Sequence, residues 1–214
     1  MSKRFGDSRP IQTARFYRFI KHRLRSNRDC KILITSRNSE TGTSKTTLAL
    51  HLAKALDPSW HIGKHFHDGY AYADYYMESL KGDVLIVDDF QFSADSRRGT
   101  SKVNVLLSQY WSIMRVKNVV SIVTLPSSSM LDKRFLELAD IRINVERRGL
   151  AVPYRIIVND FSGRITQWAF KDELGVRENI LYGPLDHDPL YREIEVNKDK
   201  FVKKRLKEMK AERN

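Results

Sequence analysis

Short apolar runs alternate along the chain with segments whose apolar residues recur at helical spacing. Four of these runs are rich in β-branched residues and predict buried strands at 31–35, 84–90, 119–126 and 141–146. The helical spacing predicts helices at 46–56, 71–80, 101–115 and within 127–140, and only 59–71 resists assignment. Because strands that alternate with helices form parallel βαβ units, we expect an α/β fold with a mainly parallel sheet and helices on both faces.

The last part of the chain and its two ends follow other patterns. Residues 154–160 and 164–170 alternate in period two around a Phe-Ser-Gly turn, which predicts a C-terminal β-hairpin. Residues 9–25 and the tail from 189 onward predict basic terminal helices. We therefore divide the chain into a basic N-terminal helical extension (1–28), a core (29–175) and a C-terminal segment with a basic helix (176–214).

The stretch SETGTSKT at 39–46 follows the first predicted strand and opens a helix. It resembles the phosphate-binding pattern GxxxxGK[ST], with Ser39 and Ser44 in place of the two glycines and with Gly42, Lys45 and Thr46 kept. In such a loop, backbone N–H groups face the phosphates, the lysine reaches the β- and γ-phosphates, and the hydroxyl ligates Mg²⁺. A serine in the left-handed conformation costs about 1–2 kcal/mol, which is a penalty and not a prohibition. We expect a nucleotide to be bound by Ser39, Glu40, Thr41, Gly42, Thr43, Ser44, Lys45, Thr46 and Thr47.

The second predicted strand, VLIVDD, ends in two carboxylates and resembles the Walker B strand of P-loop NTPases. The resemblance implies that Asp88 and Thr46 hold Mg²⁺, and that Asp89 stands where hydrolytic members have the glutamate that activates water. Thr124, at the end of the third strand, stands at the position of a polar sensor residue. The stretch NKDK at 197–200 lacks the final aspartate of the guanine-binding pattern NKxD, so we expect ATP. The expected catalytic residues are Lys45, Asp89 and Thr124.

Residues 30–170 resemble the additional-strand (ASCE) division of the P-loop NTPases. The segment TLPSSSMLDKRFLELAD and the hairpin after it are similar to FtsK–HerA and zonula-occludens-toxin-like DNA-handling ATPases of viruses and plasmids. The chain departs from that pattern in the two loop serines, in Asp for Glu after the second strand, and in Thr where the DNA pumps often have Gln. The resemblance implies a homo-oligomer in which an arginine of one subunit reaches the γ-phosphate in the next. The candidates are Arg97, Arg98 and Arg115.

The net charge of +12 is concentrated at the two ends of the chain. Residues 1–28 contain nine Lys or Arg against one acid, and residues 198–214 contain eight against three. A nearly neutral body with two basic ends is the pattern of a polyanion binder, although a solvated charged face is the other interpretation. We expect nucleic acid, with DNA favoured, to contact Arg15, Arg18, Lys21, Arg25, Lys203 and Lys204.

The remaining composition bears on the cellular compartment and on the roles of a few single residues. A single cysteine excludes an internal disulfide and fits a reducing interior, and no apolar run is long enough for membrane insertion. We therefore expect a cytoplasmic location, in a cell or in an infected host. We also expect Trp111 and Trp168 to be core residues rather than base-stacking platforms. His65, His67 and Asp68 superficially resemble metal ligands, but no Cys or His cluster at zinc spacing accompanies them, so we do not expect a metal site there.

Three functions are compatible with these features. The leading one is an ATP-binding, ATP-hydrolysing protein that acts on nucleic acid as a translocase, packaging motor, helicase or loader. The second is a non-hydrolysing nucleic-acid-binding protein on a P-loop fold, which the two serines and Asp89 motivate. The third, a small-molecule phosphotransferase, would share the loop but would leave the basic ends unexplained. A hydrolysis assay with and without DNA separates the three.

Overall fold

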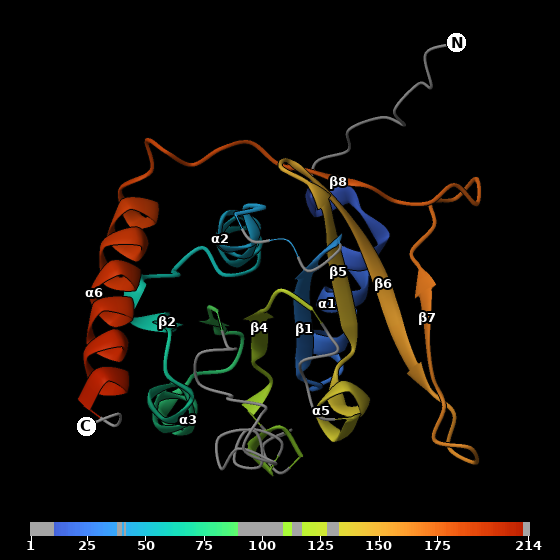
Figure 1. Cartoon of the computed structure of the whole chain (residues 1–214). Coiled ribbons are helices and arrows are strands. Elements are labelled where there is room, and N and C mark those ends of the chain that lie inside the picture. Colours follow the sequence, from blue (N-terminus) through green and yellow to red (C-terminus); the bar gives the residue numbers. More distant parts are fainter. Residues whose placement is uncertain are drawn as a thin grey trace.

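The computed structural model describes residues 11–37, 40, 42–89, 109–112, 117–127 and 133–211. Within this part of the chain eight strands form one sheet (Figure 1). The strands are β1 (Cys30–Ser36), β2 (His65–Phe66), β3 (Val84–Val87), β4 (Val120–Thr124), β5 (Ile141–Arg147), β6 (Leu150–Val158), β7 (Ile165–Ala169) and β8 (Ile180–Leu181). The helices are α1 (Arg15–Arg25), α2 (Lys45–Leu56), α3 (Gly69–Glu78), α5 (Lys133–Leu138) and α6 (Pro189–Ala211), with short 3-10 helices η1 (Ile11–Thr13) and η3 (Ile62–Lys64).

The sheet is parallel over its larger part. Strands β2, β3, β4, β1 and β5 lie side by side in that order and run parallel, and β6 and β7 continue the sheet antiparallel. Strand β4 lies between β1, which precedes the phosphate loop, and β3, which precedes the two carboxylates. The strand order therefore confirms the expected α/β fold.

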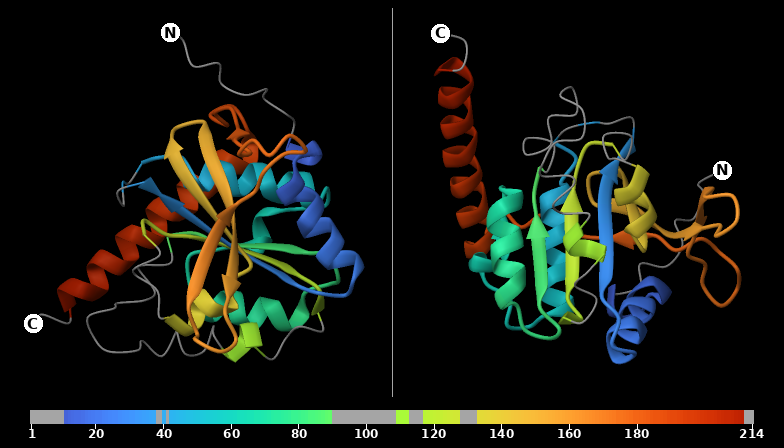
Figure 2. Two further views of the ribbon diagram at one scale, coloured as in Figure 1. Left: turned by 90° about the vertical axis from the view of Figure 1, so that its right-hand side faces the viewer. Right: turned by 90° about the horizontal axis from the view of Figure 1, so that it is seen from below.

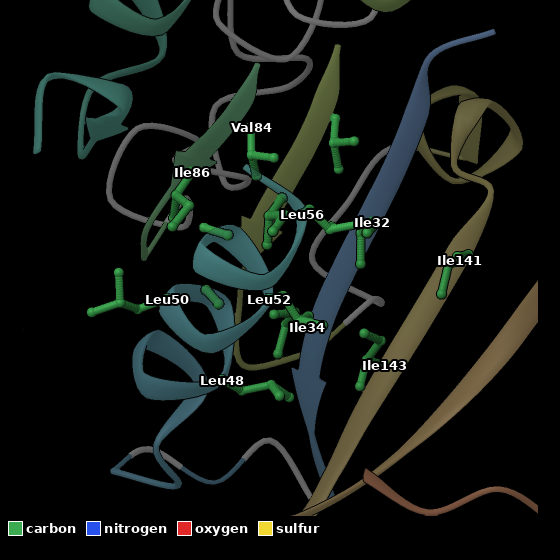
Figure 3. Close-up of a cluster of buried hydrophobic side chains, with 14 of the residues drawn as sticks. Ile32, Ile34, Leu48, Leu50, Leu52, Leu56, Val84, Ile86, Ile141 and Ile143 are labelled. Carbon is green, nitrogen blue, oxygen red and sulfur yellow. The ribbon is translucent and has the colours of Figure 1, made fainter. Parts of the chain in front are cut away.

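Both faces of the sheet are buried around β1, β3 and β4, which explains why these strands are mostly apolar without alternation. On β1, Ile32 and Ile34 point to a cluster shared with α1 and α2, whereas Leu33 points to a second cluster with Tyr72 of α3 and Phe135 of α5. Figure 3 shows the first cluster between α2 and the strands. Figure 2 shows helices on both sides of the sheet, as expected.

The two basic helices lie on different sides of the molecule. Helix α1 packs against the sheet behind β1 and β5, and Phe16 and Ile20 are its fully buried residues (Figure 1). Helix α6 stands beside β2 at the other edge of the sheet, and its Ile194 is fully buried in the same core cluster. The expected basic terminal helices and the hairpin of β6 and β7 are thus present.

Two strands were not predicted, and both are only two residues long. Strand β2 lies in the unassigned stretch 59–71, and β8 pairs with β6 near the end of the core. The helix predicted at 101–115 lies mostly outside the described residues. None of the helices that the structure describes combines the length and the apolar character needed to cross a membrane.

Candidate nucleotide-binding site

Two of the described residues in the loop between β1 and α2 have the left-handed backbone conformation. Gly42 has φ of 67° and Ser44 has φ of 62°, so both occupy the left-handed region. Ser44 caps α2 with its carbonyl, which accepts from the Leu48 N–H at 3.1 Å, while its hydroxyl donates to the Thr43 carbonyl at 2.6 Å. The serine therefore adopts the conformation of the glycine that it replaces. Ser39 and Thr41 lie outside the described residues.

Lys45, the first residue of α2, points back into this loop. Its ammonium donates to the Glu40 carbonyl at 3.1 Å and lies 3.4 Å from Thr43 Oγ1 and 3.5 Å from Ser36 Oγ. Burial lowers the pKa of Lys45 from its ordinary value, against the opposing effect of Asp89 and Asp88. The loop thus holds a cation at its centre, surrounded by oxygen atoms that a phosphate group could replace.

The carboxyl ends of β3 and β4 place Asp88 and Thr124 beside the start of α2. The Thr46 hydroxyl donates to Asp88 at 2.9 Å, and the Thr124 hydroxyl donates to Asp88 Oδ1 at 2.5 Å. Asp88 is fully buried, which by itself would raise its pKa, but His65, Lys198 and the two hydroxyls outweigh that effect and lower it. Asp88 therefore stays ionised and orients the Thr46 oxygen, which is a suitable ligand for Mg²⁺.

Asp89 is held at the edge of the cavity in a strained conformation. Its φ of 49° lies in the left-handed region, and its N–H donates to Thr124 Oγ1 at 2.9 Å. Its carboxylate pairs with the ammonium of Lys198 of α6 at 2.5 Å, and the same ammonium lies 3.7 Å from Asp88 Oδ2. Although burial opposes it, the pairing with Asp88 and Asp89 raises the pKa of Lys198.

Two histidines of the β2 region lie next to these carboxylates. His65 Nε2 is 3.9 Å from Asp88 Oδ2, and burial lowers the pKa of His65 to about 4 despite that neighbour. The imidazole is therefore neutral near pH 7. The His67 ring stacks on Phe201 of α6, with ring centroids 5.3 Å apart. Within the described ranges, no group of three His, Cys, Asp or Glu residues is placed to hold a metal ion.

A cavity of about 680 Å³ opens above the loop. Its floor is the loop and the start of α2, and its walls come from the β5–β6 turn and from the chain that leads into α6. Arg148 of the turn donates to the Gly42 carbonyl at 2.9 Å, and the Tyr182 hydroxyl lies 3.5 Å from Ser44 Oγ. The lining residues outside the loop include Asp89, Arg148, Tyr182, Tyr191, Glu195 and Lys198.

The residues present fit a nucleoside triphosphate with Mg²⁺. Gly42 and Ser44 have the left-handed conformation found in anion-binding loops, and Lys45 supplies a positive charge beside them. The Thr46 hydroxyl, oriented by Asp88, supplies an oxygen of the kind that Mg²⁺ prefers. The cavity volume lies within the range of small-molecule sites, about 300–1,000 Å³.

The structure brings most of the predicted site residues together and separates others from them. Residues 42–47, Asp88, Asp89 and Thr124 meet at one edge of the sheet, whereas Arg97, Arg98 and Arg115 lie outside the described residues. On α1 and α6 the six predicted nucleic-acid contacts are away from this cavity. Arg15, Arg18, Arg25, Lys203 and Lys204 are exposed, and Lys21 is half-buried.

The expectation for Trp168 is wrong. Trp111 is buried against Phe135 as predicted, but the Trp168 side chain on β7 is 67% exposed. It lies on the edge strand opposite Arg155, and together with Arg15 and Lys171 these residues line a shallow surface hollow of about 620 Å³. The period-two pattern predicted the strand correctly, but it could not show that nothing covers this face of β7 in the described part of the chain.

Lys198, Tyr182 and Arg148 were missed as residues of the cavity. Lys198 belongs to the NKDK stretch, which the sequence marked only as an incomplete guanine-binding pattern and as part of a basic end. No spacing rule connects it with Asp89, because the two residues are separated by about half of the chain and meet only where α6 crosses the site.

No family model and no curated protein matches this sequence. Among solved structures, the N-terminal domain of zonular occludens toxin from Neisseria meningitidis is 14% identical with a TM-score of 0.42, covering 71% of this chain and 100% of that chain. The genome packaging NTPase B204 of Sulfolobus turreted icosahedral virus 2, in complex with AMP, is 11% identical with a TM-score of 0.38, covering 66% and 97%. A KaiC-like protein from Pyrococcus horikoshii is 14% identical with a TM-score of 0.40, covering 72% and 89%.

One of these structures is a domain of a zonular occludens toxin, and another is a viral genome packaging NTPase. At TM-scores below 0.5 and identities of 11–14%, the likeness carries no activity over to this chain. The strand order and the positive φ values in the loop, by contrast, are observed in this chain itself.

Proposed function

We propose that this protein binds MgATP in the cavity above the β1–α2 loop and hydrolyses it while acting on nucleic acid. The observation that carries the proposal is that Lys45, Thr46, Asp88 and Thr124 meet beside a loop in which Gly42 and Ser44 have positive φ. Lys45 binds the β- and γ-phosphates, and Thr46 with Asp88 holds the ion. Asp89 is the base that activates water.

The nucleic-acid part of the proposal is supported by the surface around α1. Arg15 and Arg18 are exposed there, and Arg15 borders the hollow that also contains Trp168, Arg155 and Lys171. Positive side chains next to an exposed aromatic ring suit a polynucleotide, because the cations neutralise phosphates while the ring stacks on a base. DNA remains the favoured partner.

The proposal extends to assembly. We expect a homo-oligomer in which Arg97, Arg98 or Arg115 of one subunit reaches the nucleotide of the next. A nucleotide-dependent change in mass, measured by analytical ultracentrifugation, checks this expectation.

A second candidate function is a nucleic-acid-binding protein that binds ATP without hydrolysing it. The observation that favours it is the ion pair between Asp89 and Lys198, because a carboxylate paired with an ammonium is a weaker base. Phosphate release in the presence and absence of DNA decides between the two. Release that DNA stimulates supports hydrolysis, and binding without any release supports the second function.

Replacing Lys45 by alanine tests the nucleotide site directly. We expect Lys45→Ala to weaken MgATP binding by at least about tenfold and to abolish turnover, because it removes a charge-assisted contact to the phosphates. Isothermal titration calorimetry and phosphate release measure the two effects. Lys54→Ala, on the same helix but paired with Asp188 away from the loop, is the matched control. Unchanged affinity and turnover in Lys45→Ala would refute the assignment.

A further inference from the structure

Lys198 of α6 lies beside the carboxylates of Asp88 and Asp89, inside the cavity and not on an exposed basic surface. We propose that Lys198 is a further residue of the nucleotide site, and that it binds the terminal phosphate of a nucleoside triphosphate from within the same chain. This inference deepens the proposed function and rests on it. It would make the site selective for a triphosphate over a diphosphate.

The helix that carries Lys198 forms a fixed wall of the cavity. Tyr191, Glu195, Lys198 and Val202 all line the cavity, and their spacing of three to four residues places them on one face of α6. Ile194, one turn before Lys198, is fully buried in the core cluster. The first half of α6 is therefore anchored to the core of the protein.

The side chain of Lys198 reaches the reacting end of the site. Its ammonium lies 2.5 Å from Asp89 Oδ2 and 3.7 Å from Asp88 Oδ2, and the side chain is 28% exposed. Lys45 approaches the same space from the loop, so the two lysines enter from different walls. Lys45 is placed for the phosphates that the loop cradles, and Lys198 is placed for a group that lies next to Asp89.

Charge balance explains why a cation is needed at that place. Asp88 and Asp89 carry two negative charges, and Lys45 and Lys198 offset them. A terminal phosphate beside Asp89 would be repelled by that carboxylate, and Lys198 compensates for the repulsion. The lysine stem is flexible, so the ammonium can pass from Asp89 to a phosphate oxygen while the helix stays in place.

The transfer also connects phosphate binding with the ion pair at Asp89. Without a terminal phosphate, the ammonium of Lys198 is paired with the Asp89 carboxylate. A terminal phosphate offers the ammonium a second anionic partner. A diphosphate provides no partner at this position, so the pair with Asp89 persists. Lys198 thus distinguishes the two nucleotides and releases Asp89 only for the triphosphate.

The test compares binding of two nucleotides to the full chain. A non-hydrolysable imido analogue of ATP and ADP, each with Mg²⁺, are titrated by calorimetry into wild type, Lys198→Met and Lys198→Arg. We expect Lys198→Met to weaken the triphosphate analogue by about tenfold and ADP by less than about twofold, with Lys198→Arg keeping most of the preference. Lys200→Met, an exposed lysine on the same helix, should match wild type.

Each other result counts against the proposal. An equal loss of affinity for both nucleotides, or no loss of affinity, would refute the proposal that Lys198 recognises the terminal phosphate. Tighter binding of both nucleotides to Lys198→Met would mean that the lysine blocks the site. If wild type binds neither nucleotide, the proposed function fails as well, and this result is distinct from the others.

Loss of Lys198 leaves two carboxylates facing each other, which could unfold the variant. The same comparison is then made between Asp89→Asn and Asp89→Asn/Lys198→Met, because the amide removes one of those charges. The second variant should still lose the preference for the triphosphate analogue. Equal preference in the two variants would overturn the proposal.

Discussion

Ser44 shows at the scale of one residue how this loop departs from the usual pattern. It has φ of 62° and ψ of 37°, a conformation that glycine adopts at no steric cost. Its hydroxyl donates to the Thr43 carbonyl at 2.6 Å, and Tyr182 lies within 3.5 Å of it. The left-handed serine costs about 1–2 kcal/mol, which these contacts partly offset.

Replacing Ser44 by glycine should relieve the strain and open the loop to phosphate. We expect Ser44→Gly to bind MgATP more tightly, while its free energy of unfolding stays within about 1 kcal/mol of wild type, because glycine also gains entropy in the unfolded chain. Calorimetric titration and chemical denaturation measure the two quantities.

Weaker MgATP binding by Ser44→Gly would contradict this expectation. It would mean that the serine hydroxyl is itself a ligand of the nucleotide. Ser44→Ala separates the two effects, because it removes the hydroxyl and keeps the left-handed strain.

At the scale of elements, a buried ion triad joins three segments at the ends of α2 and β3 that lie away from the site. Lys64 of η3 pairs with Asp57, after α2, at 2.7 Å and with Asp83, before β3, at 2.9 Å. All three residues are buried. The triad fixes the chain that leads into β2, and therefore the position of His65 and of the β2–β3 pair.

Lys64→Met should destabilise the fold strongly, because it leaves two buried carboxylates without their cation. We expect a loss of about 3–5 kcal/mol in the free energy of unfolding at pH 7. The exposed pair of Lys203 and Asp199 on α6 provides the control, since Lys203→Met should cost at most about 0.5 kcal/mol. Urea denaturation measures both.

The pH dependence of this effect has a definite sign. Burial raises the pKa of Asp57, but hydrogen bonds from Lys64 and Ser59 outweigh it and lower the pKa below its ordinary value. A carboxyl with a lowered pKa stabilises the fold above its unfolded pKa of about 3.9, and this contribution is lost as pH falls through the folded pKa. The difference between wild type and Lys64→Met should therefore shrink as the pH falls below about 4. A constant difference would contradict the triad.

At the scale of the whole molecule, the two basic helices face different surroundings. Helix α1 contributes Arg15 to the hollow that contains Trp168 and Arg155, whereas α6 lines the cavity above the β1–α2 loop. Arg18 on α1 is 3.6 Å from Glu173, so part of its charge is engaged. We expect the α1 side to carry the larger share of nucleic-acid binding, because it combines cations with an exposed ring.

Charge reversal on each helix separates their contributions. Replacing Arg18, Lys21 and Arg25 by Glu should weaken DNA binding and reduce the slope of log K against log salt by up to about three, since each phosphate contact contributes about 0.9. The triple reversal of Lys203, Lys204 and Lys207 changes the net charge equally and should have a smaller effect. Fluorescence anisotropy across a salt series measures both, and MgATP binding should be unchanged.

Trp168→Ala supplies a probe of stacking in the same experiment. It should weaken binding of single strands by about 1–3 kcal/mol without changing the salt slope. If every variant had the DNA affinity and salt slope of wild type, the prediction would be wrong and α1 would be an ordinary solvated face.

The sequence by itself determined the longer strands of the sheet and the local parts of the site. Apolar runs predicted β1, β3, β4 and β5, and of these β1, β3 and β4 are buried on both faces along their whole length. The loop residues 42–46 and the carboxylates after β3 could also be predicted from the sequence, because each belongs to a local pattern next to a strand.

Only the tertiary structure decided which distant residues complete the site. Lys198 meets Asp89 because Ile194 anchors α6 in the core and the helix then crosses the cavity. Trp168 is exposed because it lies on an edge strand, a position that period-two alternation does not specify. Both outcomes depend on long-range packing, in which the contacts of a residue are set by the path of the whole chain and not by its neighbours in sequence.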